Sequence, residues 1–182
     1  MFKEYPGRPY KISPTERTPE QQALIDRILS GPRKEIPPNL EIWLNSPAFA
    51  SVAESFGAYV TKLSPMTVRA REIVILVVAS FWQSAFEWHW HDLFARKAGL
   101  TDAQILAIKE KTSARFEDAV EQVTFDVAAA LLEQRCVDDA LHERAMRLLG
   151  HRGVADIVGL VGLYTMIAMT MDFYCVPVET VE

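Results

Sequence analysis

Three ionisable or polar side chains of this sequence have a spacing that could support proton transfer. The stretch "SAFEWHWHDLF", residues 84–94, holds two of the four histidines and two of the four tryptophans of the chain. On a helix, Ser84, Glu87 and His91 follow one another at intervals of three and four residues and therefore share one face. A carboxylate beside an imidazole favours the charged imidazolium and fixes which ring nitrogen carries the proton. Glu87 and His91 could therefore act as an acid and base pair.

The same cluster has plainer interpretations, and the spacing alone leaves them open. Glu87 and His91 could form only a surface pair, worth a few tenths of a kcal/mol. His89 and His91 point roughly 200° apart on a helix and the pattern is not HExxH, so we expect no metal site. We expect Trp88 to flank His91 and exclude water, and Trp90 and His89 to point elsewhere. The types of Trp82, Trp88 and Trp90 favour a place in the core or a subunit interface over a ligand platform.

The composition of the chain limits the kinds of protein that it can be. The chain has 182 residues, of which 49% are apolar and 24% are charged, which suits one globular domain. Its net charge is -5 and no basic run occurs, so we expect neither nucleic acid nor membrane as a partner. The polar N-terminus has no apolar signal core, and Cys136 and Cys175 form no CxxC, so we expect a cytoplasmic location. The uncharged run over residues 157–171 is short for a membrane span and predicts a buried helix.

The hydrophobic periodicity predicts an all-α fold, a single-domain helical bundle of about seven or eight helices. We expect an extended N-terminal arm over residues 1–16 and one helical domain over residues 17–182. Thr18 and Thr101 are expected helix N-caps. A break or kink is expected near Gln83–Ala85, and a loop over residues 32–45. The last helix is expected to begin at about Val154.

Residues 71–110, "REIVILVVASFWQSAFEWHWHDLFARKAGLTDAQILAIKE", resemble the carboxymuconolactone decarboxylase / alkylhydroperoxidase D family. The shared features are an "RE" helix, a small-polar turn, "EW..H...A...GL" and a capped "TD..I..I" helix. The segments "SPAFASVAESFGAYV" and "LVGLYTMIAMTMDFYCVPVE" resemble other parts of the same family. The resemblance implies an alkylhydroperoxidase D-like helical domain that forms a homo-oligomer, whether a trimer, a hexamer or a dimer.

The resemblance also implies which family chemistry to expect. Peroxidase-type members carry Cys-x-x-Cys, a histidine four residues later and a glutamate twelve residues before the first cysteine. These positions correspond here to Ser84 and Glu87 for the cysteines, His91 for the histidine and Glu72 for the glutamate. Because thiol peroxidases need a thiolate and a resolving thiol, we do not expect that activity. Decarboxylase-type members, which keep a carboxylate and the histidine without the cysteine pair, resemble the chain better.

We therefore predict a cofactor-independent lyase or isomerase that acts on a small carboxylated lactone or a related acid. His91, held by Glu87, is the candidate acid and base. Glu72 is either a second proton carrier or the residue that orients His91. Because the "REIVIL" segment is too apolar for a solvated helix, we predict that these three side chains share one mostly buried pocket, with His89 outside it.

Three further residues are candidates for substrate binding. Arg71 could clamp a substrate carboxylate, and Arg69 is the other arginine that could do so, although each could instead form a surface or interface salt bridge. Ser84 could donate a hydrogen bond to the substrate or simply cap a helix. Trp88 could cover the ligand.

Two other functions remain as alternatives. The first is an alkylhydroperoxidase or peroxiredoxin-type antioxidant, which the missing CxxC disfavours. The second is a non-catalytic oligomeric domain that binds a small apolar acid or a partner protein through its tryptophan-rich surface.

Overall fold

The structure is a computed structural model that describes residues 7–9, 11–31 and 34–178, and within these ranges it is all-α. The described helices are α1 Pro19–Ser30, α2 Pro38–Trp43, α3 Pro47–Ala58, α4 Val68–Trp82, α5 Ala85–Lys97, α6 Asp102–Lys109, α7 Ala119–Ala129, α8 Asp139–Leu148 and α9 Gly150–Tyr174. Single π-helical turns follow α3 and α7, at Tyr59–Leu63 and Ala130–Gln134.

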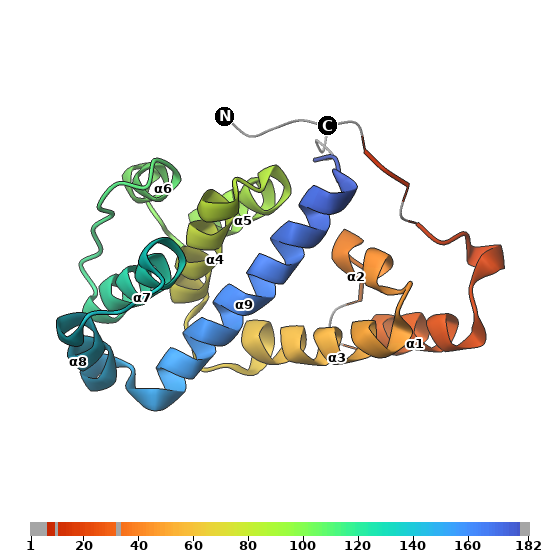
Figure 1. Ribbon diagram of the computed structural model, residues 1–182, viewed down its shortest axis with the longest axis horizontal. Coiled ribbons are helices and arrows are strands. Elements are labelled where there is room, and N and C mark those ends of the chain that lie inside the picture. Colours follow the sequence, from red (N-terminus) through yellow and green to blue (C-terminus); the bar gives the residue numbers. More distant parts are fainter. Residues whose placement is uncertain (1–6, 10, 32–33, 179–182) are drawn as a thin grey trace.

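Helix α4 is the centre of the bundle. Its residues from Ile73 to Ser80 are all buried, which means that protein surrounds this part of the helix on every side. It packs against α5, α7 and α9. Helix α9 runs between the group formed by α1–α3 and the group formed by α4–α8 (Figure 1). Polar side chains that point inward from α4 therefore have no access to bulk water except through a cavity.

Helix α9 begins at Gly150 and not at about Val154 as predicted. Gly150 has a φ of 65°, a conformation that glycine adopts without strain, and so α9 can follow α8 directly. By length and hydropathy α9 is the one helix in the described ranges that could cross a membrane, and half of its most apolar window is buried. It packs against α2, α4 and α7. Its apolar composition is thus explained by the core, while the cytoplasmic location stays a prediction.

The local signals of the sequence act as predicted at several helix ends. The Thr18 hydroxyl accepts a hydrogen bond from the Gln21 backbone N–H, and the Thr18 backbone N–H donates one to the Gln21 side-chain oxygen, which completes a capping box. Thr101 and Gln104 form the same arrangement at the start of α6. The predicted break between α4 and α5 is confirmed, because Gln83 takes a left-handed conformation with φ 53°. This break lets α5 turn back along α4.

One prediction for the N-terminal part was wrong. Residues 38–43, expected within a loop, form α2, and Trp43 on it donates from Nε1 to Thr170 Oγ1 of α9 over 3.0 Å. Six residues are too few for a periodic pattern, so only Pro38 at the first helical position signals this helix. Within the predicted extended arm, residues 14–16 form a 3-10 turn. Residues 1–6 and 10 of that arm lie outside the described residues.

Candidate active site

Glu72 of α4 and His91 of α5 meet in the interior of the bundle. His91 Nδ1 lies 2.7 Å from Glu72 Oε2, within hydrogen-bond distance. Glu72 is only 6% exposed and His91 is 9% exposed. A carboxylate can only accept, so when Glu72 is ionised His91 Nδ1 is the donor. The predicted convergence of Glu72 and His91 is confirmed.

Glu87 stands on the other edge of the imidazole ring. His91 Nε2 lies 3.5 Å from Glu87 Oε2, a longer separation than the one to Glu72. The sequence predicts that Glu87 holds His91 by a direct hydrogen bond. The helical spacing does bring Glu87 beside the ring, but the stronger contact comes from Glu72 on the neighbouring helix. The three side chains therefore form a row, Glu72–His91–Glu87, with the imidazole in the middle.

Burial changes the protonation of this row. Burial raises the pKa of Glu87 from its ordinary 4.5 to about 7, because the ionised carboxylate loses its hydration. His91 opposes this rise in the pKa of Glu87, whereas Asp172 and Glu72 add to it through their negative charge. Near neutral pH, Glu87 can therefore either hold or release a proton, which is the condition that general acid–base catalysis requires.

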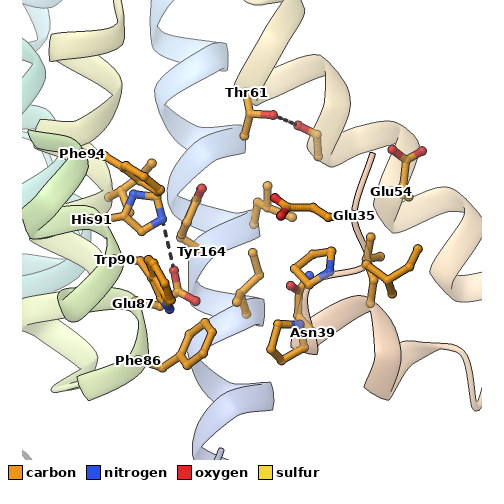
Figure 2. Close-up of a pocket in the computed structure, with 18 of the residues that line it drawn as sticks. Glu35, Asn39, Glu54, Thr61, Phe86, Glu87, Trp90, His91, Phe94 and Tyr164 are labelled. Carbon is orange, nitrogen blue, oxygen red and sulfur yellow. Dashed lines mark hydrogen bonds and ion pairs between the residues drawn. The ribbon is translucent and has the colours of Figure 1, made fainter. Parts of the chain in front are cut away.

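The row lies on the wall of a cavity of about 1050 Å³. One face of α4 lines this cavity with Val68, Arg71, Glu72 and Ile75. The aromatic residues Phe86, Trp90 and Phe94 of α5 and Tyr164 of α9 form much of the wall around His91, and Glu35, Asn39 and Glu54 lie across from them (Figure 2). The His91 ring packs edge to face against Phe94 and Tyr164, with centroid distances of 5.5 Å and 5.0 Å.

The structure separates the two candidate arginines. Arg69 lies 2.7 Å from Glu121 and also donates to Gln104 and to the Gly99 carbonyl, so its guanidinium is fully engaged in joining helices. Arg71 lines the cavity instead. Within residues 7–9, 11–31 and 34–178 its guanidinium forms no hydrogen bond or ion pair. Arg71 is therefore the arginine that a ligand in the cavity could reach.

The two other predicted substrate-binding residues do not line the cavity. Ser84 is fully buried at the start of α5, and its hydroxyl finds no hydrogen-bond partner among the described residues. Trp88 is buried beneath Lys109, whose Nζ lies 5.5 Å from the ring centroid. Trp90, which we had expected to point elsewhere, lines the cavity. His89 lies outside it, as predicted.

Sequence reasoning missed the aromatic wall. Phe86, Trp90 and Phe94 recur every four residues on α5, and this spacing could have indicated a shared face. Nothing in the sequence connects Tyr164 with them, because it lies on a helix 70 positions further along the chain than Phe94. Cys136 is exposed and Cys175 is partly exposed, and neither lines the cavity. In the described part of the chain, no three His, Cys, Asp or Glu side chains are arranged to hold a metal ion.

Comparisons with known proteins identify the fold. No protein-family model matches the chain, and no curated protein matches its sequence. A solved structure of an uncharacterized peroxidase-related protein from Silicibacter sp. TM1040 is 16% identical, with a TM-score of 0.72 over 96% of this chain and 93% of that one. The debrominase Bmp8, solved as a cysteine-to-alanine variant with 2,3,4-tribromopyrrole, is 10% identical, with a TM-score of 0.70 over 94% and 91%. The likeness confirms the all-α, alkylhydroperoxidase D-like fold.

The raised pKa of Glu87 predicts a pH-dependent stability. Between pH 4.5 and 7 the folded state keeps the Glu87 proton while the unfolded state has released it, so stability falls as pH rises through this window. Glu87→Gln removes the ionisation. The variant should therefore gain roughly 2 kcal/mol of unfolding free energy relative to the wild type between pH 5 and pH 8.

Urea unfolding followed by circular dichroism at both pH values measures this difference. Glu110→Gln, at an exposed glutamate that ends α6, is the matched control and should follow the wild type at both pH values. An equal pH dependence in Glu87→Gln and the wild type would show that Glu87 is already ionised in the folded protein at pH 5.

Proposed function

We propose that the protein is a cofactor-independent lyase or isomerase that acts on a small carboxylated lactone or a related acid. The observation that supports this best is the buried row Glu72–His91–Glu87 on the wall of a cavity that Arg71 also lines. Burying two carboxyl groups and an imidazole costs stability unless they pair or share protons. Clusters of this kind, set in a cavity and with a shifted pKa, occur preferentially at functional sites.

The row could protonate a carbon from which carbon dioxide departs. In such a reaction the bond between the carboxylate carbon and the substrate breaks, its electron pair stays on the substrate carbon, and carbon dioxide leaves. The same carbon then takes one proton, from Glu87 or from His91 Nε2, and solvent restores that proton to the site. Glu72 holds the other ring nitrogen and so fixes the orientation of His91. Arg71 would bind a carboxylate of the substrate. The net reaction is carboxylate plus proton to product plus carbon dioxide, with no oxidant or reductant.

The comparisons are compatible with this reading at the level of the fold. The Bmp8 structure holds a small ring compound, so a protein with this fold can bind one. Because one similar structure is described as peroxidase-related, the antioxidant function is an alternative. The absence of CxxC and the position of both cysteines away from the cavity disfavour the antioxidant function. The remaining alternative is a domain that binds a small acid without converting it.

His91 should be indispensable and His89 should not. With a panel of small carboxylated lactones, we expect His91→Ala to lower turnover at least about 100-fold, because it removes the central proton carrier. His89→Ala, which changes the neighbouring histidine outside the cavity, should keep turnover within about twofold of the wild type. Release of carbon dioxide and loss of the lactone absorbance measure the reaction, and thermal melts show that both variants are folded.

Other outcomes would support the alternatives. Peroxide reduction that depends on a dithiol, and that is lost when Cys136 or Cys175 is replaced, would favour the antioxidant function. Tight binding of acids without any turnover would favour the binding domain. Equal turnover in His91→Ala and the wild type would exclude the proposed proton-transfer role.

We also propose that the protein forms a homo-oligomer. Exposed apolar side chains recur along α3 and the π turn after it with alternating intervals of three and four residues, namely Phe49, Val52, Phe56, Tyr59 and Leu63. Val52 and Leu63 are each 70% exposed. This is the heptad spacing by which one helix packs against another, and the opposite face of α3 is already buried in the bundle. A second copy of the same chain could cover these exposed apolar side chains with the same side chains of its own α3.

Light scattering at micromolar concentration tests this proposal. The wild type should have the mass of an oligomer. Val52→Asp should lower this mass, because it places a charge among the exposed apolar side chains of α3. Leu106→Asp is the matched control, because Leu106 is also exposed but lies on α6, far from α3 (Figure 1). A monomeric wild type would contradict the proposal, and an unchanged mass in Val52→Asp would exclude α3 as the contact.

A further inference from the structure

The cavity is much larger than a small lactone requires. Ligand pockets commonly enclose about 300–1,000 Å³, and this one encloses about 1050 Å³. Along α5 its wall extends from Phe86 to Lys97, a rise of about 16 Å at 1.5 Å per residue. A five-membered ring with a carboxylate would occupy only a part of this length. The proposed reaction therefore leaves most of the cavity without a role.

One end of the cavity is cationic. Lys62 of the π turn, Arg71 of α4 and Lys97 of α5 all line the cavity. They belong to the same end because Arg69 binds the Gly99 carbonyl, which places the start of α4 beside the end of α5. Lys62 precedes the start of α4 by only a short link, residues 64–67.

Among residues 7–9, 11–31 and 34–178, these three cations have no carboxylate partner. Among the described residues neither Lys62 nor Arg71 forms a hydrogen bond or an ion pair, and Lys97 lies 5.9 Å from the centre of the Phe94 ring. Lys62 and Lys97 are exposed, so they add positive charge, whereas Arg71 is partly buried and can form directed hydrogen bonds. In a chain with a net charge of -5, this end is suited to an anion.

The other end of the cavity is apolar. Phe86 in the first turn of α5 lies there, and Figure 2 shows it away from Thr61 and Phe94, with His91 and Trp90 between. Apolar residues of α2 and α9, and of the segments next to these two helices, also line the cavity. They include Ile36, Leu40, Trp43, Leu163, Ile167 and Val176. The wall opposite α5 also carries the carboxylates of Glu35, Glu41 and Glu54. Of these, Glu41 is paired with Lys11, which also lines the cavity, at 3.6 Å. Glu35 and Glu54 lie on the Thr61 side of the cavity, away from Phe86 (Figure 2).

We infer that the substrate is an elongated amphipathic acid, with its anionic group at Lys62, Arg71 and Lys97 and an extended alkyl or aryl portion along the apolar end. The claim that this acid is converted rests on the proposed function, whereas the claim that it binds does not. Within the proposed substrate class, the inference specifies the kind of acid that the site would convert. In this orientation the middle of the molecule lies beside His91 and Glu87, between the two ends of the cavity.

A series of phenylalkanoic acids, from phenylacetate to 8-phenyloctanoate, tests the inference by binding alone. Trp90 in the wall makes tryptophan fluorescence a suitable signal, and calorimetry provides a second one. The dissociation constant should fall by roughly threefold for each added methylene, up to the length of the cavity. The neutral amide of the longest member should bind at least about tenfold more weakly than the acid.

Three variants separate the two ends. Arg71→Gln should weaken binding of the acids about tenfold and leave the amide unchanged. Arg115→Gln, at an exposed arginine that does not line the cavity, is the control and should change neither. Val176→Trp, just after the end of α9, should weaken the long acids and spare phenylacetate, because it fills the apolar end. Thermal melts confirm folding of each variant.

Affinity that is independent of chain length would overturn the inference, as would an equal loss for acid and amide in Arg71→Gln. Failure of the whole series to bind would also overturn it. These outcomes differ from failure of the proposed function, in which the phenylalkanoic acids bind with the predicted length dependence but no carboxylated lactone is converted.

Discussion

The contact between Glu72 and His91 is the constraint on which the rest of the structure depends. A carboxylate on the central helix cannot stay ionised in the core unless a donor reaches it. His91 Nδ1 meets this need at 2.7 Å, but only because Gln83 adopts a left-handed conformation and sends α5 back along α4. The break between α4 and α5 and the buried pair therefore require each other. Without the break, His91 would continue along the axis of α4 and could not face Glu72.

The same packing explains why Glu87 differs chemically from Glu72. Glu72 has a hydrogen-bond partner at close range, whereas Glu87 lies 3.5 Å from the ring and keeps a pKa raised by burial to about 7. Two carboxyl groups on opposite edges of one imidazole thus differ in their surroundings, and we propose that one holds the ring and the other exchanges a proton. Helices α2 and α3, across the cavity from this row, leave space beside it rather than filling it. A purely structural buried pair would not need that space.

Much of this arrangement could be predicted from local patterns. The caps at Thr18 and Thr101, the break after α4 and the burial of Glu72 follow from residue types and from the apolar character of the surrounding segment. The contacts that decide the site were less accessible. A helical pattern shows that Trp88 and Trp90 point in different directions, but not which of them faces a neighbouring helix. The part played by Tyr164 depends on how α9 crosses α5, which no local signal encodes.

The most direct test of this account is the protonation of the His91 ring, read by nuclear magnetic resonance of protein labelled with nitrogen-15 at histidine. The His91 signals are assigned by comparison with His91→Ala. At neutral pH we expect a strongly downfield, slowly exchanging proton on Nδ1, because Glu72 accepts from it in a buried site. Glu72→Gln should shift this proton upfield and speed its exchange, while Glu110→Gln should not. An Nδ1 that carries no proton at neutral pH, or a signal that Glu72→Gln leaves unchanged, would contradict the account.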